Sequence, residues 1–267
     1  MSMRLAWLTD LHLNFVGRAV VDAFFQEVAS ELPDAVLLTG DVGEADSVVP
    51  YLLALGERLP CPIYFVLGNH DFYGDGVEAV RDRVLRCCRQ SSHLRWLSEI
   101  EVVGLTASTG LVGHDGWADG RYGDYLRSKV DLNDYHHIQE LTGLTHAQRF
   151  GVVQHLGDEG AAHLDRVLPL ALARYRKVIV LTHVPPFRDA CRHDGQVQDD
   201  QWAPHFGCRA VGDVLLEAAT AHPDRELIVF CGHTHSPAHL TIAPNLTVIV
   251  GSAVYGKPVV QAVMDAD

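Results

Sequence analysis

The stretch Ile63–Asp71, IYFVLGNHD, decides the fold of this chain. Its first five residues are apolar and partly aromatic or β-branched, which is typical of a short buried strand. The last four are Gly68, Asn69, His70 and Asp71, and among these Gly and Asn favour a turn. The strand is therefore predicted to end where side chains that can bind a metal ion begin.

Similar apolar runs recur along the chain. Besides residues 63–67, five brief runs rich in Val, Ile and Leu are predicted to be buried strands: 4–9, 35–39, 177–182, 227–231 and 246–250. Between them, apolar residues recur at helical spacing over 20–32, 77–88 and 211–218, which predicts helices. Strands that alternate with helices are typical of an α/β fold. We expect residues 1–267 to form a single domain.

Two segments interrupt this alternation. Residues from about 108 to 150 are rich in Gly, Asp, Tyr and His with little strand pattern, and residues 185–204 are polar and rich in turn formers. Long irregular segments inside compact domains commonly carry function. We therefore expect the 108–150 segment to be an insertion that faces the substrate.

Composition narrows the function classes. The formal net charge of −13 disfavours binding to long nucleic acid or to an anionic membrane, and leaves open a phosphorylated small molecule or nucleotide as substrate. The six cysteines contain no CxxC pair, which favours reduced thiols over a disulfide framework. Because the chain has neither a signal-peptide pattern nor a run of about 18 apolar residues, we expect a cytoplasmic protein.

Possible metal ligands follow five of the predicted strands. They are Asp10, His12, Asp41, Asn69, His183, His233 and His235. Because the ligand sites of open α/β sheets lie beyond the carboxyl ends of the strands, these side chains are expected to share one crevice. Carboxylate oxygen, amide oxygen and imidazole nitrogen suit divalent first-row metals such as Mn²⁺, Fe²⁺ or Zn²⁺. Each motif alone could be a helix cap or a turn, so the argument depends on their combination.

The order D-x-H, G-D, G-N-H-[D/E], H and G-H-x-H resembles the calcineurin-like metallophosphoesterase superfamily over nearly the whole chain. The resemblance implies a four-layer α/β/β/α sandwich of two mixed sheets flanked by helices, with a dinuclear metal site at the carboxyl ends of the strands. It also implies the ligands of the two divalent metals: Asp10, His12 and His235 for one, Asn69, His183 and His233 for the other, and Asp41 bridging both. The metal identities are left open between Mn²⁺, Fe²⁺/Fe³⁺ and Zn²⁺. Glu44 stands where many members have a second Asp, which puts in doubt only details around the ligands.

The chemistry of such a centre is general. Two cations roughly 3.5–4 Å apart hold a bridging water, lower its pKa and polarise phosphoryl oxygens, so that hydroxide attacks in line. The leaving alkoxide needs a proton, and we assign this role to His70, with Asp71 orienting its ring and raising its pKa. The alternative for His70 is a loop histidine that forms hydrogen bonds with the backbone.

Substrate contacts are expected in the 108–150 segment, because loops beside a rigid site carry specificity. Arg121 is the candidate for a phosphate contact through its guanidinium group, and Tyr122 and Tyr125 are candidates for stacking on a base or aryl group. The alternative for Arg121 is a surface salt bridge with Asp119 or Asp124.

The predicted function is metal-dependent hydrolysis of a phosphate ester, with a slight preference for nucleotide-like phosphodiesters. A phosphomonoesterase, a protein phosphatase and a nuclease of the same fold remain alternatives. From another class, a non-catalytic metal-binding scaffold is also an alternative, although such a scaffold should have lost a ligand or His70, and all of them are present.

Overall fold

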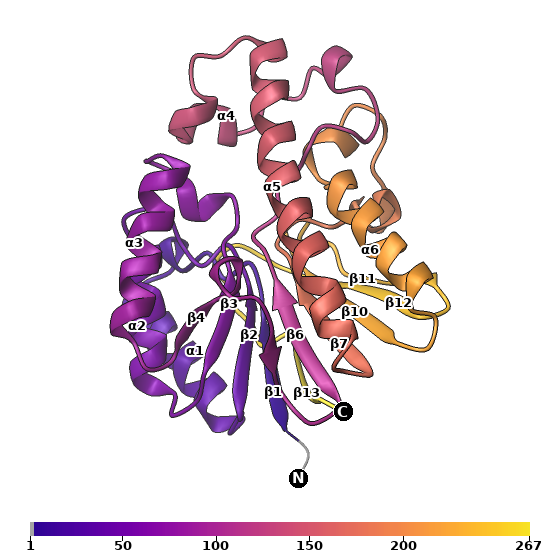
Figure 1. Ribbon diagram of the computed structural model, residues 1–267. Coiled ribbons are helices and arrows are strands. Elements are labelled where there is room, and N and C mark those ends of the chain that lie inside the picture. Colours follow the sequence, from indigo (N-terminus) through magenta and orange to yellow (C-terminus); the bar gives the residue numbers. More distant parts are fainter. Residues whose placement is uncertain (1–2) are drawn as a thin grey trace.

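The computed structural model describes residues 3–267 of the chain. Two large mixed sheets lie between helices (Figure 1). The first sheet has the order β13-β1-β2-β3-β4, with β1 (Arg4–Leu8), β2 (Ala35–Thr39), β3 (Ile63–Val66), β4 (Leu94–Trp96) and β13 (Ala262–Asp265). The second has the order β11-β12-β10-β7-β6-β5, with β5 (Val103–Gly104), β6 (Thr109–Gly113), β7 (Lys177–Leu181), β10 (Glu226–Cys231), β11 (Ala238–Ala243) and β12 (Leu246–Val250). A separate hairpin consists of β8 (Arg192–His193) and β9 (Gln196–Val197).

Helices cover the outer face of each sheet (Figure 1). The first sheet is covered by α1 (Arg18–Ser30), α2 (Val48–Arg58) and α3 (Val77–Gln90), and the second by α5 (His146–Leu172) and α6 (Arg209–Ala221). The short α4 (Asp134–His137) lies in the segment between β6 and α5. Across residues 3–267, no helix combines the length and the apolar character that crossing a membrane requires.

Three apolar clusters hold the four layers together. One joins the first sheet to α1–α3 and includes Phe25 and Phe65, and a second joins the other sheet to α5 and α6. The third lies between the sheets, where the rings of Trp7 and Phe230 have centroids 4.8 Å apart. The predicted α/β/β/α sandwich is therefore confirmed, and burial on both faces explains why its central strands are continuous apolar runs.

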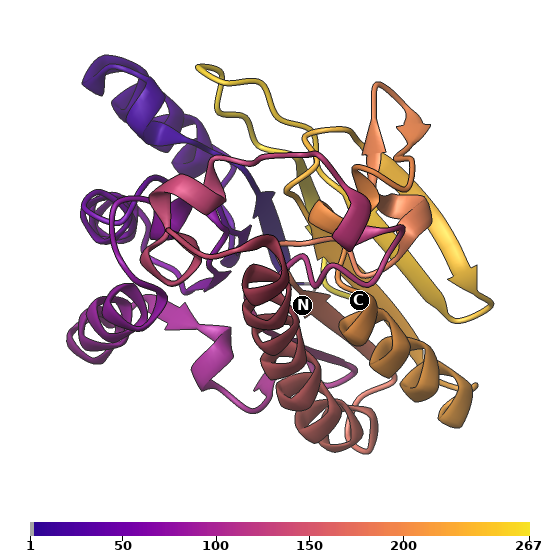
Figure 2. The same ribbon diagram turned by 90° about the horizontal axis from the view of Figure 1, so that it is seen from above.

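The irregular segment is shorter than the sequence predicts. Thr109–Gly113 forms the buried strand β6, which pairs in parallel with β7, and α5 begins at His146. This strand was not predicted because it contains two glycines, Gly110 and Gly113. Glycine weakens a strand and is found there mainly where another group approaches the backbone closely. A Cβ at Gly110 would lie 2.5 Å from the Tyr175 ring, and one at Gly113 would lie 2.7 Å from the Leu181 carbonyl oxygen. The irregular part thus spans residues 114–145 and runs across the top of the molecule (Figure 2).

Candidate metal centre

The seven predicted metal ligands come together at the carboxyl ends of five strands. Neighbouring parallel strands β1, β2 and β3 end beside one another in the first sheet, and β7 and β10 do so in the second. Asp10, His12, Asp41, Asn69 and His183 are buried, whereas His233 and His235 are half-buried. The crevice expected from the sequence therefore lies where the two sheets meet.

A first group consists of Asp10, His12, Asp41 and His235, which each offer one ligand atom, all within 4.8 Å of one another. The Nε2 atoms of His12 and His235 are 3.0 Å apart. His235 Nε2 lies 3.5 Å from Asp10 Oδ1, and His12 Nε2 lies 3.6 Å from Asp41 Oδ2. Two imidazole nitrogens thus face each other and two carboxylates, an arrangement that suits a bound cation.

A second group consists of Asn69, His183 and His233. Asn69 Oδ1 lies 3.1 Å from His183 Nε2 and 3.0 Å from His233 Nδ1. The other nitrogen of each ring donates to a backbone carbonyl, that of Thr39 at 2.7 Å for His183 and that of His205 at 3.2 Å for His233. Because carbonyls only accept, the nitrogens that face Asn69 carry lone pairs when the two rings are neutral. Three acceptors therefore converge where a cation would satisfy them.

Asp41 connects the two groups. Its Oδ2 atom lies 3.6 Å from His12 Nε2 and 3.4 Å from His183 Nε2. A carboxylate between two sets of imidazole and oxygen donors fits two divalent cations, and the donor types leave their identity open.

The ligand motifs have unusual backbone conformations. Seven non-glycine residues within residues 3–267 have positive φ, and five of them are predicted ligands: Asp10 (47°), His12 (43°), Asp41 (53°), His233 (68°) and His235 (55°). Such conformations cost about 1–3 kcal/mol each and cluster at functional sites. The backbone strain is therefore concentrated at residues whose side chains are predicted metal ligands.

The glycines of the motifs allow the strand ends to approach closely. A Cβ at Gly68 would lie 2.1 Å from Asp41 Oδ1, and one at Gly232 would lie 2.0 Å from Asp10 Oδ2. Any other residue at these positions would push a carboxylate out of the centre.

The electrostatics of the centre favour a bound cation. Burial lowers the pKa of His12 to about 4 and that of His233 to about 4, so both rings are neutral near pH 7, as metal binding requires. At His183, burial opposes protonation, but the Asp41 carboxylate outweighs it and raises the pKa to about 10. Burial also opposes ionisation of Asp41, yet the surrounding histidines hold its pKa well below the ordinary value. Asp41 stays negative and needs a positive partner, which a metal ion or a protonated His183 supplies.

His70 lies beside the centre, but Asp71 does not orient it. The His70 ring stacks on Tyr73 with centroids 4.3 Å apart, and its Nε2 lies 3.5 Å from the Tyr255 hydroxyl. Asp71 instead accepts four backbone N–H groups at 2.9–3.0 Å, those of Asp41, Val42, Gly43 and Gly68. This corrects the expectation for Asp71: its buried carboxylate faces the backbone of the neighbouring loop.

A pocket of ≈ 300 Å³ opens onto the centre. Besides Asp41, Asn69, His70, His233 and His235, its walls contain eight residues that were not predicted as site residues: Tyr73, Leu132, Asn133, Asp134, His193, Phe206, Thr234 and Tyr255. Asp134 is buried, and its Oδ1 accepts from Asn69 Nδ2 at 2.8 Å and from the Tyr73 hydroxyl. Leu132, Asn133 and Asp134 belong to the 108–150 segment that was expected to face the substrate. The other five lie beside the ligand motifs or in other loops of the chain.

The predicted substrate contacts have other partners. Arg121 forms ion pairs with Asp119 at 3.0 Å and with Asp158 at 2.7 Å, which agrees with the salt-bridge alternative. The Tyr122 hydroxyl donates to the Pro186 carbonyl at 3.0 Å. Tyr125 is 3% exposed, and its ring stacks on Phe150 with centroids 4.8 Å apart. These corrections follow from packing: the three side chains anchor the 114–145 segment and do not line the described pocket.

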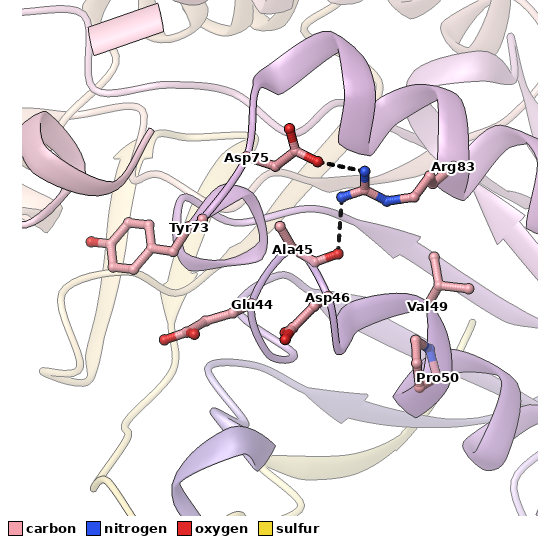
Figure 3. A pocket seen from close by; sticks show the side chains of 9 residues that line it. Glu44, Ala45, Asp46, Val49, Pro50, Tyr73, Asp75 and Arg83 are labelled. Atoms are coloured by element: carbon pink, nitrogen blue, oxygen red, sulfur yellow. Dashed lines mark hydrogen bonds and ion pairs between the residues drawn. The ribbon is translucent and has the colours of Figure 1, made fainter. Parts of the chain in front are cut away.

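A second pocket of ≈ 480 Å³ shares Tyr73 with the first. Arg83 is held there by Asp75 Oδ2 at 2.6 Å and by the Ala45 carbonyl at 3.0 Å (Figure 3). Glu44 also lines it and accepts from Asn14 Nδ2 at 3.1 Å. Arg83, Asp75 and Glu44 are thus engaged in local contacts, and none of the seven predicted ligands lines this pocket. The smaller pocket is therefore the candidate for the chemistry.

Comparisons with known proteins agree with this geometry. The family model described as calcineurin-like phosphoesterase matches residues 3–237. A UDP-2,3-diacylglucosamine hydrolase from Shewanella baltica is 35% identical over an alignment of 81 residues that covers 26% of this chain. The chain spans 34% of the length of that curated relative.

Two solved structures share the fold. A phosphopantetheinyl hydrolase from Mycobacterium tuberculosis is similar at a TM-score of 0.69 and 16% identity, over 95% of this chain and 90% of that one. A dimetal phosphatase from Danio rerio is similar at a TM-score of 0.61 and 16% identity, over 96% and 89% of the two chains.

Proposed function

The chain belongs to the calcineurin-like phosphoesterase family, and from that premise we propose that it hydrolyses phosphodiesters of small molecules at a centre of two divalent metals. The proposed ligands are Asp10, His12 and His235 for one metal and Asn69, His183 and His233 for the other, with Asp41 shared. The observation that carries the proposal is the position of Asp41 Oδ2, which lies within 3.6 Å of a histidine nitrogen of each group.

The proposed reaction needs both the bound cations and side chains of the protein. Two divalent cations, when bound, supply an acidified water and neutralise phosphoryl oxygens. His70 is proposed to donate a proton to the leaving oxygen from Nε2, which faces the Tyr255 hydroxyl at 3.5 Å. Stacking on Tyr73 limits the rotation of the His70 ring and keeps it beside the pocket.

The lining of the pocket supports a diester over a monoester. Among the described residues that line it, none is Lys or Arg, whereas Asp41 and Asp134 are acidic. A monoester dianion brings one more negative charge than a diester and finds no permanently charged Lys or Arg side chain there to balance it. The proposal includes a cytoplasmic location, which the six free cysteines support. It leaves open whether the metals are manganese, iron or zinc.

Metal analysis combined with an ester assay tests the proposal. We expect about two metal ions per chain and turnover of bis(p-nitrophenyl) phosphate that exceeds turnover of p-nitrophenyl phosphate. EDTA should abolish turnover, and Mn²⁺ added after removal of EDTA should restore it. A protein that hydrolyses neither ester, whether or not it binds metal, would instead be a scaffold.

A further inference from the structure

We propose that Tyr255 and Phe206 select phosphodiesters whose organic groups are planar rings. The inference rests on the proposed function, because it names the substrate class of the same site. Both side chains line the ≈ 300 Å³ pocket.

Tyr255 borders the first group of ligands. Its ring centroid lies 4.5 Å from that of His12 and 5.1 Å from that of His235. Phe15 extends this surface, with its ring 5.0 Å from Tyr255. Tyr255 is 50% exposed and Phe15 is 53% exposed, so packing in the core does not account for them. They form an open aromatic surface on one side of the centre.

Phe206 borders the second group. Its ring centroid lies 5.0 Å from that of His233 and 6.1 Å from that of Trp202, a half-exposed ring. The residue before it, His205, accepts the Nε2–H of His233 through its carbonyl at 3.2 Å. The loop that orients this ligand therefore also supplies its aromatic neighbour.

Each group of ligands thus has an aromatic ring of its own. A phosphate that lies over Asp41 has two organic groups if it is a diester, and these can reach the two rings. A monoester has only one such group, and an alkyl group has no flat face for stacking. Stacking of a planar group on an aromatic side chain strengthens binding by about tenfold or more. The two rings therefore favour diesters that carry aryl groups or bases.

Three p-nitrophenyl esters with the same leaving group test the inference: phenyl p-nitrophenyl phosphate, methyl p-nitrophenyl phosphate and p-nitrophenyl phosphate. We expect kcat/KM for the phenyl diester to exceed that for the methyl diester by about tenfold. Equal values for the two diesters would overturn the inference but leave the proposed function intact. If none of the esters is hydrolysed, the proposed function itself fails.

Variants identify the rings responsible. Tyr255→Leu and Phe206→Leu should each reduce the phenyl-to-methyl ratio of kcat/KM several-fold, whereas Tyr255→Phe should keep the ratio of the parent. Tyr175→Leu is the matched control, because this ring packs near Gly104 and Gly110 at the opposite ends of the strands. Metal content shows that each variant keeps its centre. A ratio that stays at the parent value in both leucine variants would contradict the assignment.

Discussion

Asn69 presents its carbonyl oxygen to His183 and His233 because its amide nitrogen is already engaged. Asp134 accepts that amide at 2.8 Å, and Asp134 also accepts the hydroxyl of Tyr73. Groups behind a ligand that fix its orientation contribute strongly to metal affinity. We therefore propose that Asp134 would support the second metal through Asn69, without contacting the metal itself.

Asp134→Ala is expected to weaken metal binding at the second site by about 10–100-fold, since Asn69 loses the partner that fixes its amide. Titration of the metal-free protein with Mn²⁺ measures the effect on each site. Asp131→Ala is the matched control, because Asp131 is an exposed carboxylate of the same segment. Equal affinities for both variants would contradict the role of Asp134.

His70→Ala is expected to lower kcat about 10²–10⁴-fold on an alkyl ester, since the leaving alkoxide then lacks a proton donor. The loss should be smaller on a p-nitrophenyl ester, and the metal content should stay unchanged. His137→Ala is the control, because this exposed ring also packs near Tyr73. Full activity of His70→Ala on the alkyl ester would exclude the role as proton donor.

At the scale of elements, the centre depends on how β2 and β3 end. Asp71 follows β3, and its carboxylate binds the backbone of Asp41, Val42 and Gly43 after β2 as well as that of Gly68. One buried side chain thus fixes two strand ends relative to each other. It holds Asp41 in its positive-φ conformation.

Asp71→Asn is expected to lower the free energy of unfolding by about 3 kcal/mol or more, because an amide group would place N–H donors against backbone N–H donors. Urea unfolding in the presence of EDTA measures this free energy for the metal-free protein, so a difference in metal binding between the variants does not affect it. Asp46→Asn, at an exposed position of the same stretch, should have almost no effect. If Asp71→Asn unfolds at the same urea concentration as Asp46→Asn, the structural role is wrong.

At the scale of the whole molecule, the strands and helices of the fold can be predicted from the sequence more completely than the residues that line the pocket. The strands that carry the ligands are buried on both faces, so they are visible as apolar runs, and their predicted bounds differ from the observed ones by at most one residue. Strand β6 was not predicted because Gly110 and Gly113 interrupt its apolar pattern. At the end of α1, Leu32 was predicted to be helical, but the helix ends at Ser30 and Leu32 is 79% exposed.

The substrate face is not readable from local sequence. Arg121 and Tyr125 have the right chemistry for substrate, but their partners come from α5 and from its surroundings, which only the fold brings near. Phe206 and Tyr255 reach the pocket from loops that follow no periodic pattern. Ligand motifs repeat at strand ends and can be recognised, whereas pocket walls depend on contacts between distant segments.

Anomalous diffraction from crystals grown with Mn²⁺ tests the two-metal centre most directly. The account predicts two peaks roughly 3.5–4 Å apart, one among Asp10, His12 and His235 and the other among Asn69, His183 and His233, with Asp41 between them. A single peak, or peaks away from these seven side chains, would contradict it.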